Sequence, residues 1–462
     1  MHRRVAIIGG GAASAALLGE LLERRPPQPL HLDWYTGGGT PARGVAYGTR
    51  SDRHLLNVRA ASMSLFAGRP QSFLDFVQQA DPAIAGTDFL PRRRYGDYLE
   101  AEVARALALG KAHGHDVRIV PFAADAAVPE ASGVTVFRGE ETRRVDAAVL
   151  AIGALPPQPL AAVGKDALAS GRYVVNPWPL LAQPPAEAPK HVVVVGLGLT
   201  AADVLLELSA HWPETRFTAI SRHGRLPEPH LRATTLPGED GTQLVETMQD
   251  NPDVRQWLRL LREAIAQGDD WRSVIDSLRP HTPALWAALP LEQRARFLRH
   301  ARWAWERARH RMPPPVHESL AALENADRLH RQRGQLYRVE PECDGLRLEL
   351  HPHDRDASKM QTLHADLVVQ SVGMDFDVAR TQHPLMRQLV VNRHVLPDPL
   401  GLGCLATPHG RLLHEGGAWP RLFAIGSLLR GTLWESTAMP EIRQQARAVA
   451  DQLLAEPHAT TP

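Results

Sequence analysis

Two short glycine-rich segments have the residue types and spacing of dinucleotide-binding turns. In the first, the apolar run at residues 5–8 ends in Gly9 and Gly11, and Ser14 stands where a third glycine is common. The first glycine of such a turn allows a tight bend, and the second lets a pyrophosphate approach the backbone. The helix that follows offers free N–H groups and the positive end of its dipole. This segment is predicted to bind a dinucleotide, and a turn that binds nothing is the alternative.

The second segment repeats this pattern in the middle of the chain. Residues 192–195 are four consecutive valines, and they lead into Gly196, Gly198 and Thr200, where a helical pattern begins. One match of this kind is weak, but two on one chain, each between a strand and a helix, indicate two dinucleotide sites. The usual reason to hold two is to pass electrons from a nicotinamide to a flavin, so we expect FAD and NAD(P)H as cofactors.

The residues that end the second strand of each unit bear on which nucleotide is bound. An acid normally holds the adenine ribose there, but the first unit has Thr36, whose hydroxyl is a weaker partner. The second unit has Ser221 and Arg222, and a guanidinium can grip a 2′-phosphate that a carboxylate would repel. Arg222 therefore favours NADPH. An arginine that stacks on adenine or lies in solvent would leave NADH use open.

The elements that must position these residues divide the chain into five stretches. Around the first turn, strand signals at 4–9, 30–35, 117–120, 134–138 and 145–152 accompany helical signals at 12–25, 71–79 and 95–110. From about 240 to 330 the spacing is helical with almost no strand signal. We predict an α/β protein with two Rossmann-like dinucleotide-binding domains, for FAD and NAD(P), and a helical insertion. The predicted parts are an FAD domain at 1–175 and 376–462, an NAD(P) domain at 176–236 and 336–375, and the insertion at 237–335.

Composition excludes several classes of protein. Of the 462 residues, 44% are hydrophobic and 22% charged, and a net charge of +1 favours neither nucleic acid nor an acidic surface as partner. Cys343 and Cys404 are too far apart for a redox dithiol motif, and the 22 histidines show no metal-binding spacing. No apolar run reaches the length of a membrane span. We expect a cytoplasmic protein without a metal or a membrane partner, and the sequence leaves its oligomeric state open.

Motifs in every part of the chain carry a family resemblance. It resembles bacterial FAD/NAD(P)-binding proteins of the YdhS-like kind at residues 43–48, 54–64, 91–99, 198–203, 221–227, 309–311 and 431–443. Its layout is more distantly similar to flavin-containing and N-hydroxylating monooxygenases. In those enzymes an asparagine followed by a methionine faces the flavin, and Asn57, followed by Met63, matches that position. FAD-dependent urate hydroxylases of purine breakdown are the relatives to which the resemblance points most closely.

The resemblance also gives the C-terminal part of the chain a role. A glycine ends the inner strand of each unit, at Gly153 and Gly373, and Gly426 ends a later apolar run. In two-nucleotide flavoproteins the helix after such a C-terminal run points its N-terminus at the flavin. Arg430 and Glu435 lie in the loop before that helix and are candidate catalytic residues, with a surface ion pair as the alternative. Ser427 replaces the aspartate that relatives often carry, Trp434 is expected to pack in a core, and the expected N-cap is Ser436 or Thr437.

A dense cationic cluster lies near the end of the expected insertion. It comprises Arg307, Arg309, His310 and Arg311. One interpretation is a solvated helix end. The other is a lid over the nicotinamide–flavin crevice that pairs with a phosphate or an anionic substrate.

These observations favour a flavin hydroxylase that uses NAD(P)H and dioxygen on a small electron-rich substrate. The expected route is through a flavin C4a-hydroperoxide, with the conversion of urate to 5-hydroxyisourate as the specific expectation from the resemblance. A reductase that passes electrons to a quinone or a protein is the first alternative. A non-enzymatic sensor that holds its nucleotides is the second.

Overall fold

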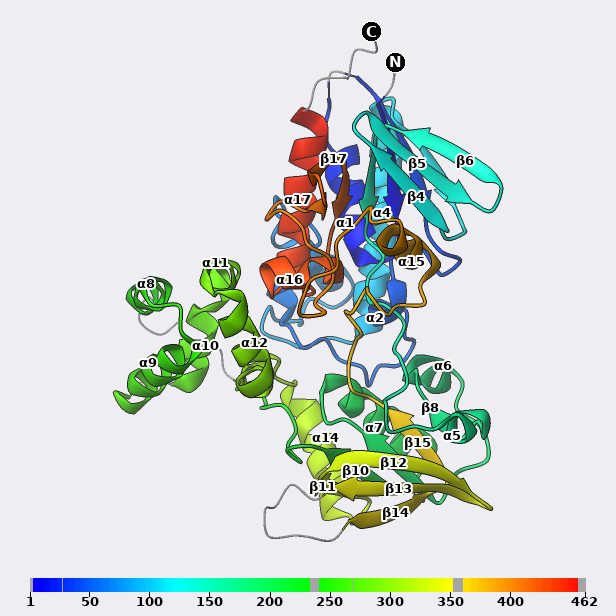
Figure 1. Cartoon of the computed structure of the whole chain (residues 1–462), viewed down its shortest axis with the longest axis vertical. Helices are drawn as coiled ribbons and strands as arrows, with labels where there is room; N and C mark the ends of the chain where they lie inside the picture. Colours follow the sequence, from blue (N-terminus) through cyan, green and yellow to red (C-terminus); the bar gives the residue numbers. More distant parts are fainter. Residues whose placement is uncertain (1–2, 27, 233–240, 269, 352–359, 456–462) are drawn as a thin grey trace.

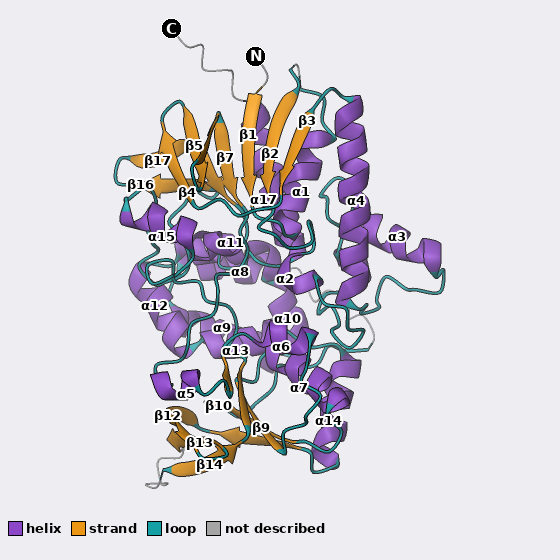
Figure 2. Cartoon of the chain, turned by 90° about the vertical axis from the view of Figure 1, so that its right-hand side faces the viewer, coloured by secondary structure: helices purple, strands orange, loops and turns teal. Residues whose placement is uncertain are grey.

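The computed structural model describes residues 3–26, 28–232, 241–268, 270–351 and 360–455. It is a mixed α/β protein with two parallel sheets, one at each end of the molecule, and a group of helices on one side between them (Figures 1 and 2). The first and last described residues, Arg3 and Ala455, lie in a strand of the first sheet and in a helix of the layer that covers it (Figure 1). This is a Rossmann-type arrangement with two nucleotide-binding units, as the sequence predicts.

The first sheet has six strands in the order β16-β17-β7-β1-β2-β3. All neighbours are parallel except β16 and β17, and the central strands are apolar on both faces because helices and a second sheet cover them. The strands are β1 (Arg3–Ile8), β2 (Leu30–Tyr35), β3 (Asp116–Val120), β7 (Ala147–Leu150), β16 (Arg411–His414) and β17 (Gly417–Ala424).

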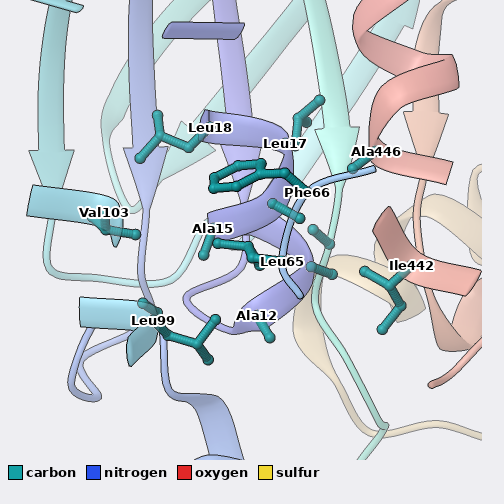
Figure 3. Packing of buried hydrophobic residues seen from close by; sticks show 14 of the residues in the cluster. Ala12, Ala15, Leu17, Leu18, Leu65, Phe66, Leu99, Val103, Ile442 and Ala446 are labelled. Carbon is teal, nitrogen blue, oxygen red and sulfur yellow. The ribbon is translucent and has the colours of Figure 1, made fainter. Parts of the chain in front are cut away.

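One face of this sheet is covered by α1 (Ala12–Leu22), α4 (Arg92–Ala112) and α17 (Met439–Ala455). Helix α1 lies in the middle, and ten of its eleven residues are buried. Phe66 packs so closely on it that a Cβ at Gly19 would come within 2.2 Å of the ring, and Leu99 and Ile442 belong to the same core (Figure 3). Short elements border this layer: α2 (Gly44–Tyr47), η1 (Ala60–Ser62) and α3 (Ser72–Ala80).

The other face is covered by a small antiparallel sheet and a helix. The sheet has the order β4-β5-β6, and α15 contacts its β4. The apolar run predicted as one strand at 145–152 is divided, since β6 ends at Val145 and β7 begins at Ala147. Asp146 lies between them, and its carboxylate accepts a hydrogen bond from the Arg4 N–H at 2.7 Å. The elements are β4 (Ala126–Glu130), β5 (Gly133–Arg138), β6 (Glu141–Val145) and α15 (Pro384–Val391).

The second parallel sheet repeats this layering with five strands in the order β11-β10-β9-β15-β8. Helices α6, α7 and α14 share a core with one face, and α5 shares one with the other face together with the antiparallel sheet β12-β13-β14. The strands are β8 (Tyr173–Val174), β9 (His191–Val195), β10 (Arg216–Ser221), β11 (Leu329–Arg333), β12 (Gln335–Glu342), β13 (Gly345–His351), β14 (Gln361–Ala365) and β15 (Leu367–Gln370). The helices are α5 (Lys165–Ala169), α6 (Pro177–Ala182), α7 (Leu199–His211) and α14 (Pro314–Asn325).

The insertion is helical, as the spacing of its apolar residues predicts, and it has its own core. Trp434 of the C-terminal segment belongs to that core and stacks on Trp286 at 4.8 Å, so the expectation that Trp434 packs in a core is confirmed. The helices are α8 (Thr242–Asp250), α9 (Val254–Ala266), α10 (Trp271–Ser277), η2 (Arg279–His281), α11 (Thr282–Ala288), α12 (Leu291–His300) and α13 (Arg302–Arg309). Two short C-terminal helices precede α17, namely η3 (Ser427–Leu429) and α16 (Arg430–Leu433), and α16 contacts α11.

Two elements lie in the second sheet although the boundaries predicted at 175 and 335 place them elsewhere. Strand β8 pairs with β15, and β11 pairs with β10. Helix α14 packs on α7 in the same unit rather than in the insertion. Short edge strands such as β8 have too few residues to show a pattern, and only their sheet partners reveal where they belong.

Candidate functional site

Parallel pairing brings four of the predicted cofactor residues to one edge of the first sheet. Gly9 follows β1, Thr36 follows β2, Gly153 lies three residues beyond β7, and Gly426 lies two residues beyond β17. These four strands are neighbours with the same direction, so their carboxyl ends meet at this edge. Ligands of open α/β sheets bind at such an edge, where the strand ends leave a crevice.

Gly9 makes the sharp turn after β1. Its φ of 131° favours glycine, and a Cβ there would lie 2.1 Å from the carbonyl oxygen of Ala151. The turn is closed by hydrogen bonds, because the Gly9 N–H donates to the Tyr35 carbonyl at 2.8 Å and the Trp34 indole donates to the Gly9 carbonyl at 2.8 Å. Only glycine therefore fits at this position, because the protein's own backbone, and not a ligand, occupies the space of a side chain.

Gly11 is different, because the protein leaves space beside it. A Cβ at this position would have the Cα of Gly44 as its nearest heavy atom, at 3.7 Å, and Gly11 is the N-cap residue of α1. The buried Ser14 hydroxyl donates to the Gly11 carbonyl at 2.7 Å, so Ser14 stabilises the first turn of the helix. Open space at a helix N-terminus is what a bound pyrophosphate requires, so these residues fit a dinucleotide.

The second turn has the same construction. Gly196 has a φ of 114°, and a Cβ there would lie 2.4 Å from the Ser371 carbonyl oxygen. Gly198 is the N-cap of α7 and would have no atom within 4 Å of its Cβ. Thr200 lies in the first turn of that helix and is partly exposed. A second dinucleotide therefore fits here by the same criterion.

The ends of β2 and β10 differ in accessibility. Thr36 is buried, and its N–H and hydroxyl both donate to the Val120 carbonyl, at 2.9 and 3.3 Å. Its hydroxyl has only acceptor capacity left for another partner. Arg222 is exposed, whereas the Ser221 hydroxyl accepts a hydrogen bond from Gly224 N–H at 3.0 Å and so shapes the loop behind Arg222. Arg222 after β10 is therefore open to a charged ligand, whereas Thr36 at the end of β2 is buried.

The C-terminal segment closes over the first turn. Gly426 has a φ of 87°, and its N–H donates to the Gln445 side chain at 2.8 Å. The Ser427 hydroxyl donates to the Gly153 carbonyl, which joins this segment to the strand end below it. The capping expectation for α17 is wrong: the Ile442 N–H donates to the Ala438 carbonyl at 2.9 Å, so Ala438 occupies the N-cap position.

Arg430 and Glu435 are buried and belong to one charged network with the insertion. The Arg430 guanidinium pairs with Glu306 at 2.8 Å and lies over the rings of Phe376 and Trp434, at 4.4 and 4.6 Å. Burial lowers the pKa of Arg430. The alternative of a surface ion pair is wrong for both residues, since they are 7% and 6% exposed.

The network around Glu435 keeps its carboxylate ionised. Trp305 donates to it at 3.1 Å, and His310 lies 3.6 Å away. Burial by itself raises the pKa of Glu435, but His310, Arg309 and the Trp305 hydrogen bond outweigh burial and hold that pKa well below its usual range. A carboxylate that is already fully ionised and bonded is suited to positioning other groups rather than to accepting a proton.

Asn57 is connected to this region by His230, a residue that the sequence did not identify as a candidate. The Asn57 carbonyl accepts a hydrogen bond from Nε2 of His230 at 3.1 Å. Burial, followed by the charges of Arg311 and Arg59, lowers the pKa of His230 to about 4, so its ring is neutral near pH 7. Within the described residues, no hydrogen bond or ion pair joins the Asn57 side chain to Arg430 or Glu435.

The cationic cluster at 307–311 is only partly solvated. Arg309 and Arg311 are buried, whereas Arg307 is partly exposed and pairs with Glu228. The solvated interpretation therefore fails for the two buried arginines. His230, Trp305 and Glu306 are further members of this region, and their isolated positions in the sequence carry no motif that could have revealed them.

Comparison with known proteins bears on this geometry. Residues 6–155 match the family model described as FAD-NAD(P)-binding. The match spans the first glycine turn and the elements from α1 to β7. No sequence among the curated proteins matches the chain.

Solved structures of similar fold cover nearly the whole chain. An ornithine N-hydroxylase from Kutzneria sp. 744, solved with reduced FAD, NADP+ and L-ornithine, matches with a TM-score of 0.63 at 17% identity over 98% of this chain and 99% of its own. An L-lysine 6-monooxygenase from Pseudomonas syringae matches with 0.65 at 19% identity over 99% and 100%. A bacillithiol disulfide reductase from Staphylococcus aureus matches with 0.54 at 11% identity over 98% of each chain. At these identities the likeness concerns the fold.

Two absences hold for the described residues. None of their helices combines the length and the apolar character that crossing a bilayer requires. Within the same residues, His, Cys, Asp and Glu side chains nowhere gather in groups of three or more that could hold a metal ion.

Proposed function

We propose that this protein is an NAD(P)H-dependent FAD monooxygenase that acts on a small molecule. The observation that carries the proposal is the pair of matched turns, each with open space beside the second glycine at a helix N-terminus. Two such sites on one chain suit the transfer of a hydride from a nicotinamide to a flavin. The fold that the chain shares with hydroxylases of ornithine and lysine supports the further step to oxygen chemistry.

In this proposal the first unit holds FAD. Gly9, Gly11 and Ser14 shape the turn that receives the pyrophosphate, and Thr36 is the candidate partner for the adenine ribose. Gly153 and Gly426 leave room at the strand ends on the other side of the crevice. Bound FAD supplies the redox and oxygen-activating chemistry, which no amino-acid side chain can supply by itself.

The second unit holds the nicotinamide nucleotide. Gly196, Gly198 and Thr200 form its turn, and Ser221 and Arg222 meet its adenosine end. Arg222 is exposed at the end of β10, where a guanidinium can take up a 2′-phosphate in two parallel hydrogen bonds. NADPH is therefore the proposed electron donor, with NADH as the weaker one.

The chain's own contribution to the reaction is to bind and orient the substrate and to exclude water. Asn57 is the candidate residue beside the flavin, and His230 fixes its backbone. Arg430 and Glu435 are held rigidly by the insertion and offer a positive and a negative group of fixed position. Preorganised charges of this kind lower the cost of placing a polar substrate in a closed site.

Urate is the specific substrate that we propose, on the strength of the family resemblance. It is an electron-rich heterocyclic anion, and its oxidation to 5-hydroxyisourate needs no strong base from the protein. The test is stopped-flow oxidation of NADPH by the FAD-loaded protein in air, with and without urate. We expect slow oxidation alone and faster oxidation with urate, with urate absorbance and oxygen falling together.

The outcomes separate the substrate from the activity. If urate leaves both flavin reduction and oxygen consumption unchanged, urate is not the substrate, and a panel of purines and amines is tested in the same way. If NADPH does not reduce the flavin under any condition, the monooxygenase proposal itself fails. Arg430→Met and Asn57→Ala should retain FAD but release hydrogen peroxide in place of oxidised urate, because a misplaced substrate uncouples the reaction.

A reductase is the second candidate, because the chain shares its fold with a disulfide reductase as well. A dithiol mechanism has no support in this chain, since Cys343 is exposed and Cys404 buried, and both are free. Burial, with the charge of Asp398, raises the pKa of Cys404 to about 12, so its thiol is unreactive. A quinone acceptor is the form of this candidate that remains, and anaerobic quinone reduction faster than aerobic turnover would favour it.

A further inference from the structure

Three arginine side chains are buried where the insertion meets the C-terminal segment. Arg309, Arg311 and Arg430 are 9%, 4% and 7% exposed. Of the carboxylates that pair with them in the described chain, Glu435 is buried and the Glu441 side chain is 17% exposed, whereas the Glu306 and Asp276 side chains are 32% and 46% exposed. Burial of charge is costly unless each charge is paired and hydrogen-bonded. This region therefore holds more buried positive charge than buried negative charge.

Arg309 is the least satisfied of the three. Its Nε is buried and has no hydrogen-bond partner in the described part of the chain. The carboxylates that face it are distant, with Glu435 at 3.9 Å and Glu441 at 4.0 Å, which is too long for hydrogen bonds. Both carboxylates also have other donors, since Glu435 accepts from Trp305 at 3.1 Å and Glu441 accepts from Arg279 at 2.9 Å.

Arg309 has both negative and positive neighbours: the charges of Glu435, Glu441 and Asp276 favour its ionised form, and that of Arg279 opposes it. His230 is within the electrostatic reach of Arg59, Arg309 and Arg311, and their charges help to keep it neutral. Arg311 pairs with Asp276, but its own Nε is also buried without a hydrogen-bond partner in the described residues. These groups come from the insertion, the loop after β10 and the FAD domain, so the site exists only in the folded protein.

We propose that Arg309 and Arg311, beside His230 and Asn57, bind the negatively charged group of the substrate, so that the substrate is a small oxyanion, either a carboxylate or an ionised heterocycle. This inference rests on the proposed monooxygenase function and names its substrate class. A guanidinium fork recognises such groups through two parallel hydrogen bonds, which would satisfy the unpartnered nitrogens. The partly exposed side chains of Arg279 and His310 border the site, at 26% and 35% exposure, and provide its solvent side.

The charge of this site would select among small substrates. L-ornithine, which is bound in one of the structures of similar fold, carries a carboxylate as well as amino groups. Arginines beside His230 and Asn57 would repel an ammonium group and attract an oxyanion. Three arginines line the surface cavity of about 270 Å³ beyond β10. Arg307 and Arg331 are paired there with Glu228 and Glu324, and Arg225 is exposed rather than buried.

Equilibrium dialysis of the FAD-loaded protein against radiolabelled urate, benzoate and cadaverine tests this inference without any turnover. Cadaverine is a diamine without a carboxylate, so we expect saturable binding of urate, benzoate or both, and much weaker binding of cadaverine at the same concentrations. Tighter binding of urate than of benzoate would identify the heterocyclic anion as the preferred class, and the reverse order would identify the carboxylate. Binding of cadaverine that equals or exceeds that of both anions would overturn the proposal.

Variants of Arg309 make the test specific for the site. Arg309→Met removes the charge with little change in shape and should weaken anion binding roughly tenfold or more, because a charged hydrogen bond is lost. Arg309→Lys keeps the charge but loses the fork, and an intermediate affinity is expected. Arg299→Met is the matched control, since Arg299 is exposed on the same insertion and should bind anions as the wild type does. Thermal melting and FAD content check that each variant is folded.

The result can be separated from that of the proposed function. Reduction of the flavin by NADPH in the absence of substrate is measured for the wild type and for Arg299→Met, which should have the same rate. If NADPH fails to reduce the wild-type flavin, the monooxygenase proposal fails while dialysis still reports on the anion site. If both folded Arg309 variants bind urate and benzoate as the wild type does, or if Arg309→Met weakens NADPH binding instead, the anion site is disproved.

Discussion

The two glycine turns of this chain are nearly identical in backbone and differ in their surroundings. Gly9 and Gly196 have φ values of 131° and 114°, and at each a Cβ would overlap the carbonyl oxygen of a neighbouring strand end. Gly11 and Gly198 both cap a helix beside open space. The pattern of strand, glycines and helix is thus sufficient to produce the turn twice, whatever surrounds it.

The surroundings decide what each turn is suited to bind. Helix α1 is buried on ten of its eleven residues between α4 and α17, and Ser427 ties the C-terminal segment to Gly153 above the first turn. Helix α7 has more exposed positions, and the loop after β10 carries the exposed Arg222. A closed site suits a cofactor that stays bound, and an open one suits a nucleotide that must enter and leave during each cycle.

The largest effect should come from the first glycine of either turn. Gly9→Ala and Gly196→Ala should each lower the free energy of unfolding by about 3 kcal/mol or more, because backbone strain adds to a clash with a carbonyl oxygen. Gly171→Ala is the control, since Gly171 also has a positive φ, 70°, but no atom within 4 Å of its Cβ. It should cost only about 1 kcal/mol. Urea unfolding checks this, and equal losses at Gly9 and Gly171 would contradict the role given to the carbonyl.

The second glycine of each turn should separate the two nucleotides. Gly11→Val should leave the protein folded but without FAD. The protein leaves space for a Cβ at this position, but the new side chain would occupy the place that the pyrophosphate needs. Gly198→Val should keep its FAD and instead raise the KM for NADPH. Flavin absorbance of the purified variants and steady-state kinetics check the pair. Loss of FAD from Gly198→Val, or its retention in Gly11→Val, would break the assignment of the two sites.

The loop after β10 should distinguish the two nicotinamides. Arg222→Ala should raise the KM for NADPH roughly tenfold or more, and that for NADH much less, because only NADPH has the 2′-phosphate. Arg216→Ala is a matched control at the opposite end of the same strand, where the side chain is also exposed. Initial rates with both nucleotides check this. Equal changes for the two nucleotides would show that Arg222 does not contact the phosphate.

The smallest effect concerns His230, which links the loop after β10 to Asn57 of the first unit. Because the folded protein lowers the pKa of His230 from 6.5 to about 4, its neutral form contributes stability above pH 6.5. That contribution declines as the pH falls from about 6.5 to about 4. His230→Gln should therefore lose less stability than the wild type over this interval. Urea unfolding at several pH values checks it, and an unchanged pH dependence would show that His230 titrates normally.

Local patterns in the sequence determined most of what repeats in this molecule. The two turns, the parallel strands before them and the helical insertion all follow from glycine spacing and apolar periodicity. Such features depend on residues a few positions apart. The local sequence therefore determines the backbone conformation there, with little influence from the rest of the chain. Short edge strands such as β8 and β11 were missed because their few residues show no period.

Only the tertiary structure decided which charges are buried together. His230, Arg309 and the neighbouring residues Arg430 and Glu435 come from three separate stretches of the chain. Neither their burial nor their contacts can be read from spacing. A run of arginines at a helix end looks solvated in the sequence, because the solvation of a side chain depends on what packs against it. Here the C-terminal segment packs against the insertion. That contact buries charged residues that would otherwise lie on the surface, and they form part of the candidate site.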